Sequence, residues 1–123
     1  MDRKTILIVD DSDSICTGIA FLLEIDGHAT LTAFDGEEGI RKARQHRPDV
    51  ILLDIMMPVL DGWGAIKQLR AIGETARIPV LALTALKLDR EQVAAAGFTG
   101  YLQKPIPPHR LKEEIDRACA PVG

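Results

Sequence analysis

The sequence predicts an α/β fold in which a single five-stranded parallel sheet is covered by five helices on both faces. The first observation is residues 50–53, four apolar residues that run directly into Asp54. Such a run is typical of a strand buried on both faces of a parallel sheet, and Pro58 marks the turn that follows. The second is the alternation of such runs with segments of helical periodicity. Helical crossovers favour parallel, right-handed connections, with helices on both faces of the sheet.

Five short segments rich in apolar or β-branched residues are predicted to be the strands. They are residues 5–9, 28–33, 49–54, 80–84 and 100–103. The second segment carries the weakest strand signal, and the third contains the continuous apolar run 50–53. Asp54 therefore falls at the carboxyl end of a buried strand, the edge of an open α/β sheet where ligands bind.

Capping residues and apolar positions at helical spacing predict the helices. Their predicted first residues or caps are Ser12 or Asp13, Asp35, Asp61, Asp89, and Pro107 or Pro108; the predicted stops of the first, second and fourth are Gly27, Pro48 and Gly97. Residues 35–38 also form a capping-box pattern, with an acceptor at the first position and Glu38 three residues later.

Composition limits the classes of function. The 123 residues suffice for one domain, expected to have its core at residues 4–119 and a frayed tail at 120–123. The net charge of −3 argues against nucleic acid as a direct partner. No apolar run approaches the roughly 20 residues of a membrane span, so a cytoplasmic location is expected. Cys16 and Cys119 lack metal-ligand spacing and are interpreted as buried or half-buried thiols.

Polar residues follow four of the five predicted strands, and parallel strands deliver them to the same rim. They are Asp10 and Asp11, Asp54, Thr84, and Lys104. Three clustered carboxylates need a counter-charge, and a lysine together with a hard divalent cation such as Mg²⁺ would supply it. A carboxylate in such a site can attack phosphorus to give an aspartyl phosphate. The Thr84 hydroxyl and the Lys104 ammonium suit the charge of the transferring group.

With these residues in this order, the chain resembles the receiver domains of two-component response regulators, such as the chemotaxis receivers, over nearly its whole length. The stretches that carry the resemblance are ILIVDDS, DVILLDIMMPVLDGW, VLALTA and GYLQKPI. The resemblance implies a flavodoxin-like sheet with the strand order 2-1-3-4-5.

The resemblance also implies a role for each site residue. Asp54 would accept a phosphoryl group from a phosphohistidine. Asp11, Asp54 and the backbone carbonyl of Met56 would hold Mg²⁺ (or Mn²⁺), with Asp10 helping through water. Lys104, whose bond to Pro105 is cis in the family, would pair with the phosphoryl group.

The implied output is a shift between two conformational states. Thr84 would move towards the phosphate, and Tyr101 would rotate inward. The implied partners are a histidine kinase or a histidine phosphotransfer protein, and a downstream effector protein or domain. The resemblance also leaves open a dimer of the domain that forms on phosphorylation. The domain would then be a signalling switch that catalyses its own phosphorylation, and not an enzyme that releases a product.

Three features depart from the family pattern or add to it. The segment from Thr84 to Tyr101 is slightly shorter than usual, which predicts a short or displaced fourth helix and altered partner recognition on that face. Met56 and Leu86, two residues after Asp54 and Thr84, cannot orient a water molecule well, which predicts slow self-dephosphorylation. Ile15 is either a contact for the phosphoryl donor or part of the core.

Two other functions stay open at this point. One is a pseudo-receiver that binds partners without being phosphorylated. The other is a phosphatase of the haloacid-dehalogenase type, which also forms an aspartyl phosphate with Mg²⁺. That family requires an aspartate two residues after the nucleophile, where this chain has Met56.

Overall fold

The computed structural model describes residues 3–120, and within them strands and helices alternate in the predicted order. The strands are β1 (Thr5–Val9), β2 (Ala29–Ala33), β3 (Val50–Asp54), β4 (Val80–Thr84) and β5 (Gly100–Gln103). The helices are α1 (Asp13–Ile25), α2 (Gly36–His46), α3 (Gly62–Ala71), α4 (Arg90–Ala96) and α5 (Pro108–Ala118).

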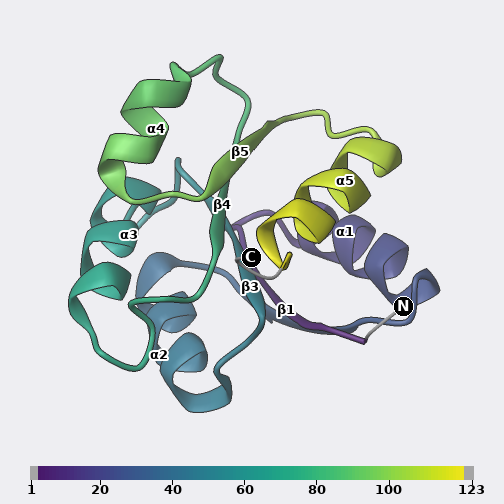
Figure 1. Cartoon of the computed structure of the whole chain (residues 1–123), viewed down its shortest axis with the longest axis horizontal. Coiled ribbons are helices and arrows are strands. Elements are labelled where there is room, and N and C mark those ends of the chain that lie inside the picture. Colours follow the sequence, from purple (N-terminus) through teal and green to yellow (C-terminus); the bar gives the residue numbers. More distant parts are fainter. Residues whose placement is uncertain (1–2, 121–123) are drawn as a thin grey trace.

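The five strands form one parallel sheet in the order β2-β1-β3-β4-β5. Helices α1 and α5 cover one face, and α2, α3 and α4 cover the other (Figure 1). The predicted α/β class and the 2-1-3-4-5 order are therefore confirmed. Strand β3 lies in the middle of the sheet, so its last residue, Asp54, lies at the centre of the rim formed by the carboxyl ends of the strands.

The central strands are apolar throughout because each supplies side chains to two cores. In β3, Val50 and Leu52 pack under α1 and α5, while Ile51 and Leu53 pack under α2, α3 and α4. Successive side chains of a strand point to opposite faces, and helices cover both. The continuous apolar pattern that predicted a doubly covered sheet therefore has its direct cause in this packing.

Element ends differ from the predictions by about one residue, which is the usual uncertainty of such boundaries. His28 and Asp49 precede β2 and β3, and Asp89 is the N-cap of α4 and not its first residue. Helix α2 ends at His46, before Pro48, because Arg47 adopts a left-handed conformation with φ 47°. Of the tail expected at 120–123, only Ala120 lies within the described residues.

Hydrogen bonds confirm Ser12, one of the two predicted caps of the first helix, and the predicted cap Asp35, and they show that Asp61 and Asp89 are caps as well. The side chains of Ser12, Asp35, Asp61 and Asp89 each accept from a backbone N–H in the first turn of their helix. These bonds satisfy donors that have no partner inside the helix. All four caps lie in loops at the rim formed by the carboxyl ends of the strands, and they fix where helices α1, α2, α3 and α4 leave it.

Two further observations concern the whole described chain. Across residues 3–120, each helix is too short or too polar to span a bilayer. Cys16 is buried and Cys119 partly buried, both as free thiols, in agreement with the interpretation from the sequence.

Candidate functional site

Three carboxylates meet at the centre of the rim. Asp10 follows β1 directly, Asp54 ends β3, and the two strands are neighbours in the sheet. Carboxylate oxygens of Asp10, Asp11 and Asp54 all lie within 4.8 Å of one another. Asp10 and Asp54 are buried and Asp11 is exposed. The cluster predicted from the strand ends is therefore present, with its two inner members shielded from water.

Lys104 supplies the positive charge nearest to this cluster. Its Nζ lies 2.6 Å from Oδ2 of Asp10 and 3.6 Å from Oδ1 of Asp54. The lysine side chain is 19% exposed and the Asp10 side chain 1%, so the closer pair is largely screened from solvent. One ammonium group faces three carboxylates, and the cluster keeps an excess of negative charge.

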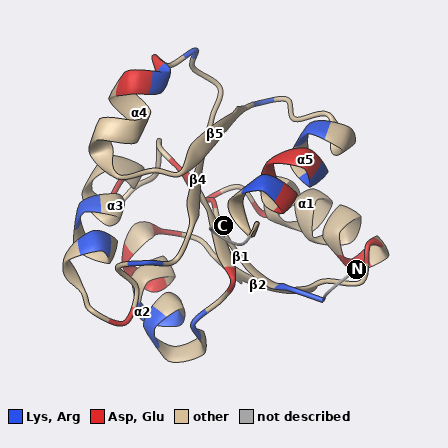
Figure 2. Cartoon of the chain, viewed as in Figure 1, with Lys and Arg blue, Asp and Glu red and all other residues tan. Residues whose placement is uncertain are grey.

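The source of that excess is visible along the chain. Between Lys4 and Arg41 the sequence contains acidic residues but no lysine or arginine. Figure 2 accordingly shows basic residues on α2, α3, α4 and α5 but none on α1. The loops after β1 and β2 thus bring only acidic charge to the rim, and the compensating lysine comes from the far end of the chain.

The carboxyl group of Asp54 is shifted towards its protonated form. Burial raises its pKa from 3.8 to about 6, and the charge of Asp10 acts in the same direction. Lys104 and the backbone N–H of Met56, which donates to Oδ1 of Asp54 at 3.3 Å, oppose the shift. For Lys104, burial alone would lower the pKa, but its hydrogen bond to Asp10 and the nearby carboxylates outweigh burial and raise it.

Two contacts to Asp10 were not predicted. The backbone N–H of Ser12 donates to Oδ1 of Asp10 at 2.9 Å, and the thiol of Cys16 donates to the Asp10 carbonyl at 3.4 Å. The first is the local turn that an aspartate makes with the backbone two residues on, so the Asp-Asp-Ser sequence contained a signal for it. Ser12 thus holds one carboxylate oxygen of Asp10 while Lys104 holds the other, and Cys16 holds its backbone carbonyl.

Gly62 positions the backbone that carries Asp54. Its N–H donates to the carbonyl of Ile55 at 2.8 Å, and a Cβ atom at this position would lie 2.5 Å from the carbonyl oxygen of Asp54. Real Cβ atoms do not approach backbone that closely. The sequence predicted a helix start here, but it gave no sign that α3 begins against the backbone of the phosphoacceptor candidate.

Thr84 is fully buried at the end of β4, one residue beyond the partner of Asp54 in the parallel register. Its Oγ1 accepts from the N–H of Leu86 at 3.0 Å, which leaves the hydroxyl hydrogen available to another acceptor. Its carbonyl accepts from the N–H of Lys104 at 2.7 Å, and the Lys104–Pro105 bond is cis, as the resemblance implied. Thr84 and Lys104 thus reach the rim side by side.

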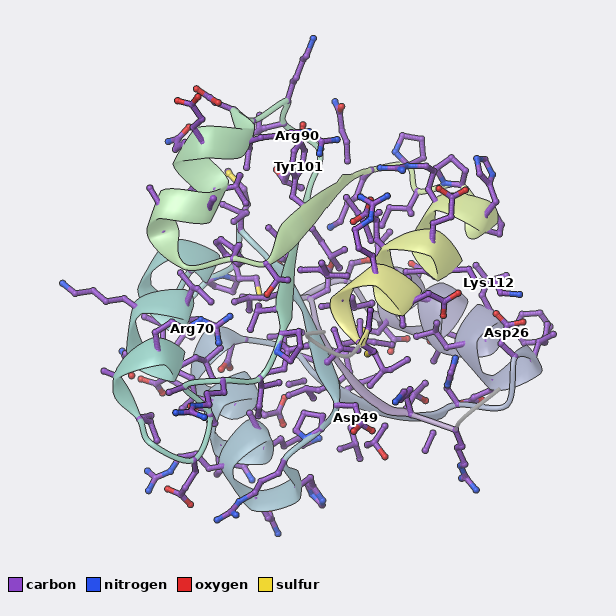
Figure 3. All side chains as sticks on the ribbon, viewed as in Figure 1. Asp26, Asp49, Arg70, Arg90, Tyr101 and Lys112 are labelled. Atoms are coloured by element: carbon purple, nitrogen blue, oxygen red, sulfur yellow. The ribbon has the colours of Figure 1, made fainter. Side chains whose placement is uncertain are left out.

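Tyr101 lies apart from the carboxylates. It is partly exposed on β5 and lines two neighbouring hollows, of about 290 and 230 Å³, on the surface formed by α4, β5 and α5. Arg90 lines both hollows as well, and Figure 3 shows the two labelled side chains near each other at the α4 side of β5. An inward rotation of Tyr101 therefore remains a prediction.

The residues singled out for their departures from the family pattern have these positions. Met56 and Leu86 are 65% and 51% exposed, at the ends of β3 and β4. Ile15 is partly buried and packs against the core beneath α1 and α5, so this position favours the core interpretation. Helix α4 has seven residues and is the shortest helix described, as predicted. Its effect on partner recognition remains a prediction.

The donor set fits a hard divalent cation. Carboxylate oxygens are the ligands that Mg²⁺ prefers, and the three in this cluster converge while only one lysine compensates them. Burial is the main cause of the raised pKa of Asp54, and the negative charge of Asp10 adds to it. Asp11, the exposed member, is the one that solvent and an entering ion can reach.

Known proteins resemble this chain over nearly all of it. Residues 6–116 match the family described as the response regulator receiver domain. Protein PilH of Pseudomonas aeruginosa is 39% identical over 117 residues, which cover 94% of this chain and 97% of PilH. The alkaline phosphatase synthesis transcriptional regulatory protein PhoP of Bacillus subtilis is 40% identical over 115 residues, which cover 92% of this chain. The chain spans 47% of the length of PhoP.

Solved structures agree. Chemotaxis protein CheY4 of Vibrio cholerae is 34% identical, with a TM-score of 0.88 over 95% of this chain and 99% of that one. The receiver domain of sensor histidine kinase PA1611 from Pseudomonas aeruginosa, solved with a magnesium ion coordinated in its active site cleft, is 36% identical. Its TM-score is 0.86, and the match covers 96% of this chain and 98% of that one.

Family, fold and site point the same way. The family match and the structural neighbours do not favour the haloacid-dehalogenase or pseudo-receiver alternatives, and the acidic cluster of a receiver domain is in place. The chain belongs to the response regulator receiver domain family, whose members are signalling switches.

Proposed function

We propose that the chain accepts a phosphoryl group on Asp54 from a phosphohistidine and passes the signal to a partner by a change of conformation. The donor would be a histidine kinase or a histidine phosphotransfer protein. The observation that carries the proposal is the position of Asp54: buried at the end of the central strand, within 3.6 Å of the Lys104 ammonium and grouped with two further carboxylates.

The reaction forms one bond and breaks one. An oxygen of the Asp54 carboxylate bonds to phosphorus while the phosphorus–nitrogen bond of the phosphohistidine breaks, and the imidazole nitrogen keeps the electron pair. Lys104 would pair with the negative charge of the transferring group, because its ammonium lies 3.6 Å from Oδ1 of Asp54. Thr84, with its hydroxyl hydrogen available, would donate to a phosphoryl oxygen once the group is bound.

Magnesium or manganese, when bound, would neutralise the phosphoryl oxygens during transfer. Asp11, Asp54 and the backbone carbonyl of Met56 would hold the ion, and Asp10 would take part through water. Asp10 would in addition keep Lys104 at the rim, since the two side chains form the closest ion pair there.

The output would be a shift between two states of the same domain. Thr84 would follow the phosphoryl group and Tyr101 would leave the surface of α4, β5 and α5, which changes what that surface can bind. PilH is matched over nearly its whole length and PhoP over about half, so the effector would be either a separate protein or a further domain. A domain core at residues 4–119, a cytoplasmic location and a phosphorylation-dependent dimer belong to the same proposal.

Intact mass after incubation with acetyl phosphate and Mg²⁺ tests the proposal. The parent protein is expected to gain one phosphoryl group, and the gain is expected to vanish without Mg²⁺ and in the Asp54→Asn variant. Equal labelling of Asp54→Asn would move the acceptor elsewhere. No gain in the parent, with acetyl phosphate or with a phosphorylated histidine kinase, would support the pseudo-receiver alternative.

A further inference from the structure

We propose that α3 forms a second connection between the phosphoacceptor loop, residues 55–61 after Asp54, and the surface that carries Tyr101. The connection runs through Trp63 and Arg70. The connection ends at the α4–β5 corner, defined as residues 97 and 98. The inference rests on the proposed function, because it describes how phosphorylation of Asp54 would be transmitted. It adds a route to the one through Thr84 and β4.

Arg70 holds the corner by directed hydrogen bonds. Its guanidinium donates to the carbonyl of Gly97 at 2.9 Å and to the carbonyls of Ala76 and Ile78 at 3.1 and 2.7 Å. The labelled side chain is seen on α3 in Figure 3. Arg70 is partly buried, and this burial lowers the pKa of its guanidinium. Three carbonyls from two segments thereby take their positions from one α3 residue.

Backbone packing reinforces the same contact. Gly97 is the C-cap of α4, with φ +109°. A Cβ atom there would lie 3.1 Å from Cγ of Arg70 and 3.5 Å from Cγ1 of Ile66. Residues 66 and 70 are one helical turn apart and share a face. The end of α4 is therefore seated directly on α3, and not only tethered to it through a long side chain.

Trp63 provides the second contact from the same face of the helix. Its ring meets that of Phe98 edge to face, with centroids 5.9 Å apart and planes at 76°. Trp63 also lines a hollow of about 390 Å³ together with Asp11, Met56 and Pro58. The indole thus contacts the corner and borders the phosphoacceptor loop.

The start of α3 is in turn fixed to the phosphoacceptor. Gly62 bonds to the carbonyl of Ile55 and lies against the backbone of Asp54 with no room for a side chain. Beyond the corner the chain enters β5, in which Tyr101 is the second residue. A shift of the Asp54 backbone would accordingly move α3, then the corner, and then the strand that carries Tyr101.

Hydrogen exchange at the amides of residues 98–101 tests the connection. Exchange is measured with and without acetyl phosphate and Mg²⁺, and labelling of each sample is read by intact mass. In the parent, phosphorylation is expected to change the exchange rate at these amides by about fivefold or more, the lower end of typical coupling between sites. In Arg70→Met the ratio between the two states is expected to fall towards one at equal labelling.

The matched control is Lys67→Met, which removes an exposed cation from the same helix and is expected to keep the parent's ratio. A merely structural role for Arg70 would speed exchange equally in both states and leave the ratio unchanged, which would overturn the inference. If Arg70→Met does not fold, Phe98→Leu removes the ring contact with Trp63 and is expected to lower the ratio as well. Absence of labelling in the parent would instead contradict the proposed function.

Discussion

Two loops at the same rim differ in how packing holds them. Residues 55–61 connect β3 to α3 and begin with buried Ile55 next to buried Asp54. They are closed by the Gly62–Ile55 hydrogen bond and by Leu60, which packs against Gly36 and Gly64. Residues 85–89 connect β4 to α4, and four of these five residues are exposed. Thr84 anchors the start of that loop through the N–H of Leu86.

The difference separates two tasks that share one rim. A nucleophile and its charged neighbours must keep their geometry, and packing against backbone provides that. A segment that responds must be able to take another arrangement at small cost, and few buried contacts provide that. The domain therefore ties the loop after Asp54 to neighbouring backbone and leaves the loop after Thr84 with fewer such contacts.

The largest expected effect comes from removing Lys104, the cation beside Asp54 at the start of the packed loop. Lys104→Met leaves Asp10 buried without its partner, and breaking such a pair typically costs about 3–5 kcal/mol. The free energy of unfolding, measured in urea, should fall by that order, and labelling by acetyl phosphate should slow strongly. Asp10→Asn in the same chain should restore much of the stability but not the labelling. A stable Lys104→Met variant with parental labelling would contradict the assigned roles.

The next effect concerns the packing under Asp54. Gly62→Ala would put a Cβ atom 2.5 Å from the Asp54 carbonyl, and such overpacking costs about 2–3 kcal/mol. Gly18→Ala is the matched control, because nothing lies within 4 Å of its Cβ position in the middle of α1. That change should stabilise by about 1 kcal/mol through helix propensity. Equal effects of the two changes in thermal unfolding would show that the loop is not fixed by this contact.

The pH dependence of stability gives a smaller, signed effect. The pKa of Asp54 is about 6 in the folded protein and 3.8 in the reference state, so the folded state binds the proton more tightly. Its contribution to stability therefore rises as pH falls through 6 and is lost as pH rises. Without divalent cations, the parent should gain about 1–2 kcal/mol relative to Asp54→Asn between pH 7 and pH 5. If the parent instead lost stability relative to Asp54→Asn between pH 7 and pH 5, the pKa of Asp54 would not be raised by burial and by the charge of Asp10.

The smallest change in stability is expected from substitutions of Leu86 on the exposed loop. These substitutions should instead change the rate at which phosphate is lost from Asp54. Leu86 is 51% exposed, so Leu86→Asn should leave unfolding nearly unchanged. A side chain that can hydrogen-bond water should speed loss of phosphate from Asp54 by about fivefold, the value of one hydrogen bond. Leu86→Ala controls for the loss of bulk and should keep the slow rate. If both variants lose phosphate at the parental rate, Leu86 does not limit the attack of water.

The acidic cluster could be predicted because it depends on topology alone. Parallel strands bring their carboxyl ends to one edge, so Asp10, Asp54 and Thr84 had to meet once the strands were recognised. The partner of Lys104 could not be assigned in the same way. The sequence indicated a role towards the phosphoryl group, whereas the shortest contact is to Asp10, a matter of side-chain reach.

The contacts of α3 were beyond prediction for a different reason. Arg70 resembles any arginine in the last turn of a helix, and Gly97 resembles an ordinary helix stop. Their hydrogen bond depends on where the loop after α4 passes α3. That position follows from the packing of all the helices on this face of the sheet. Periodicity identifies the faces of elements, but it carries no record of which loop lies against which face.

The ion pair between Asp10 and Lys104 joins residues 94 positions apart. During synthesis on the ribosome, the acidic half of the rim emerges long before β5, and until then Asp10, Asp11 and Asp54 have only solvent ions to neutralise them. Contacts of such long sequence separation form late in folding, because a large loop must close first. A nascent chain that has not yet delivered its fifth strand therefore lacks the lysine that pairs with Asp10, and the charge balance of the rim is completed only when β5 and Lys104 have joined the sheet.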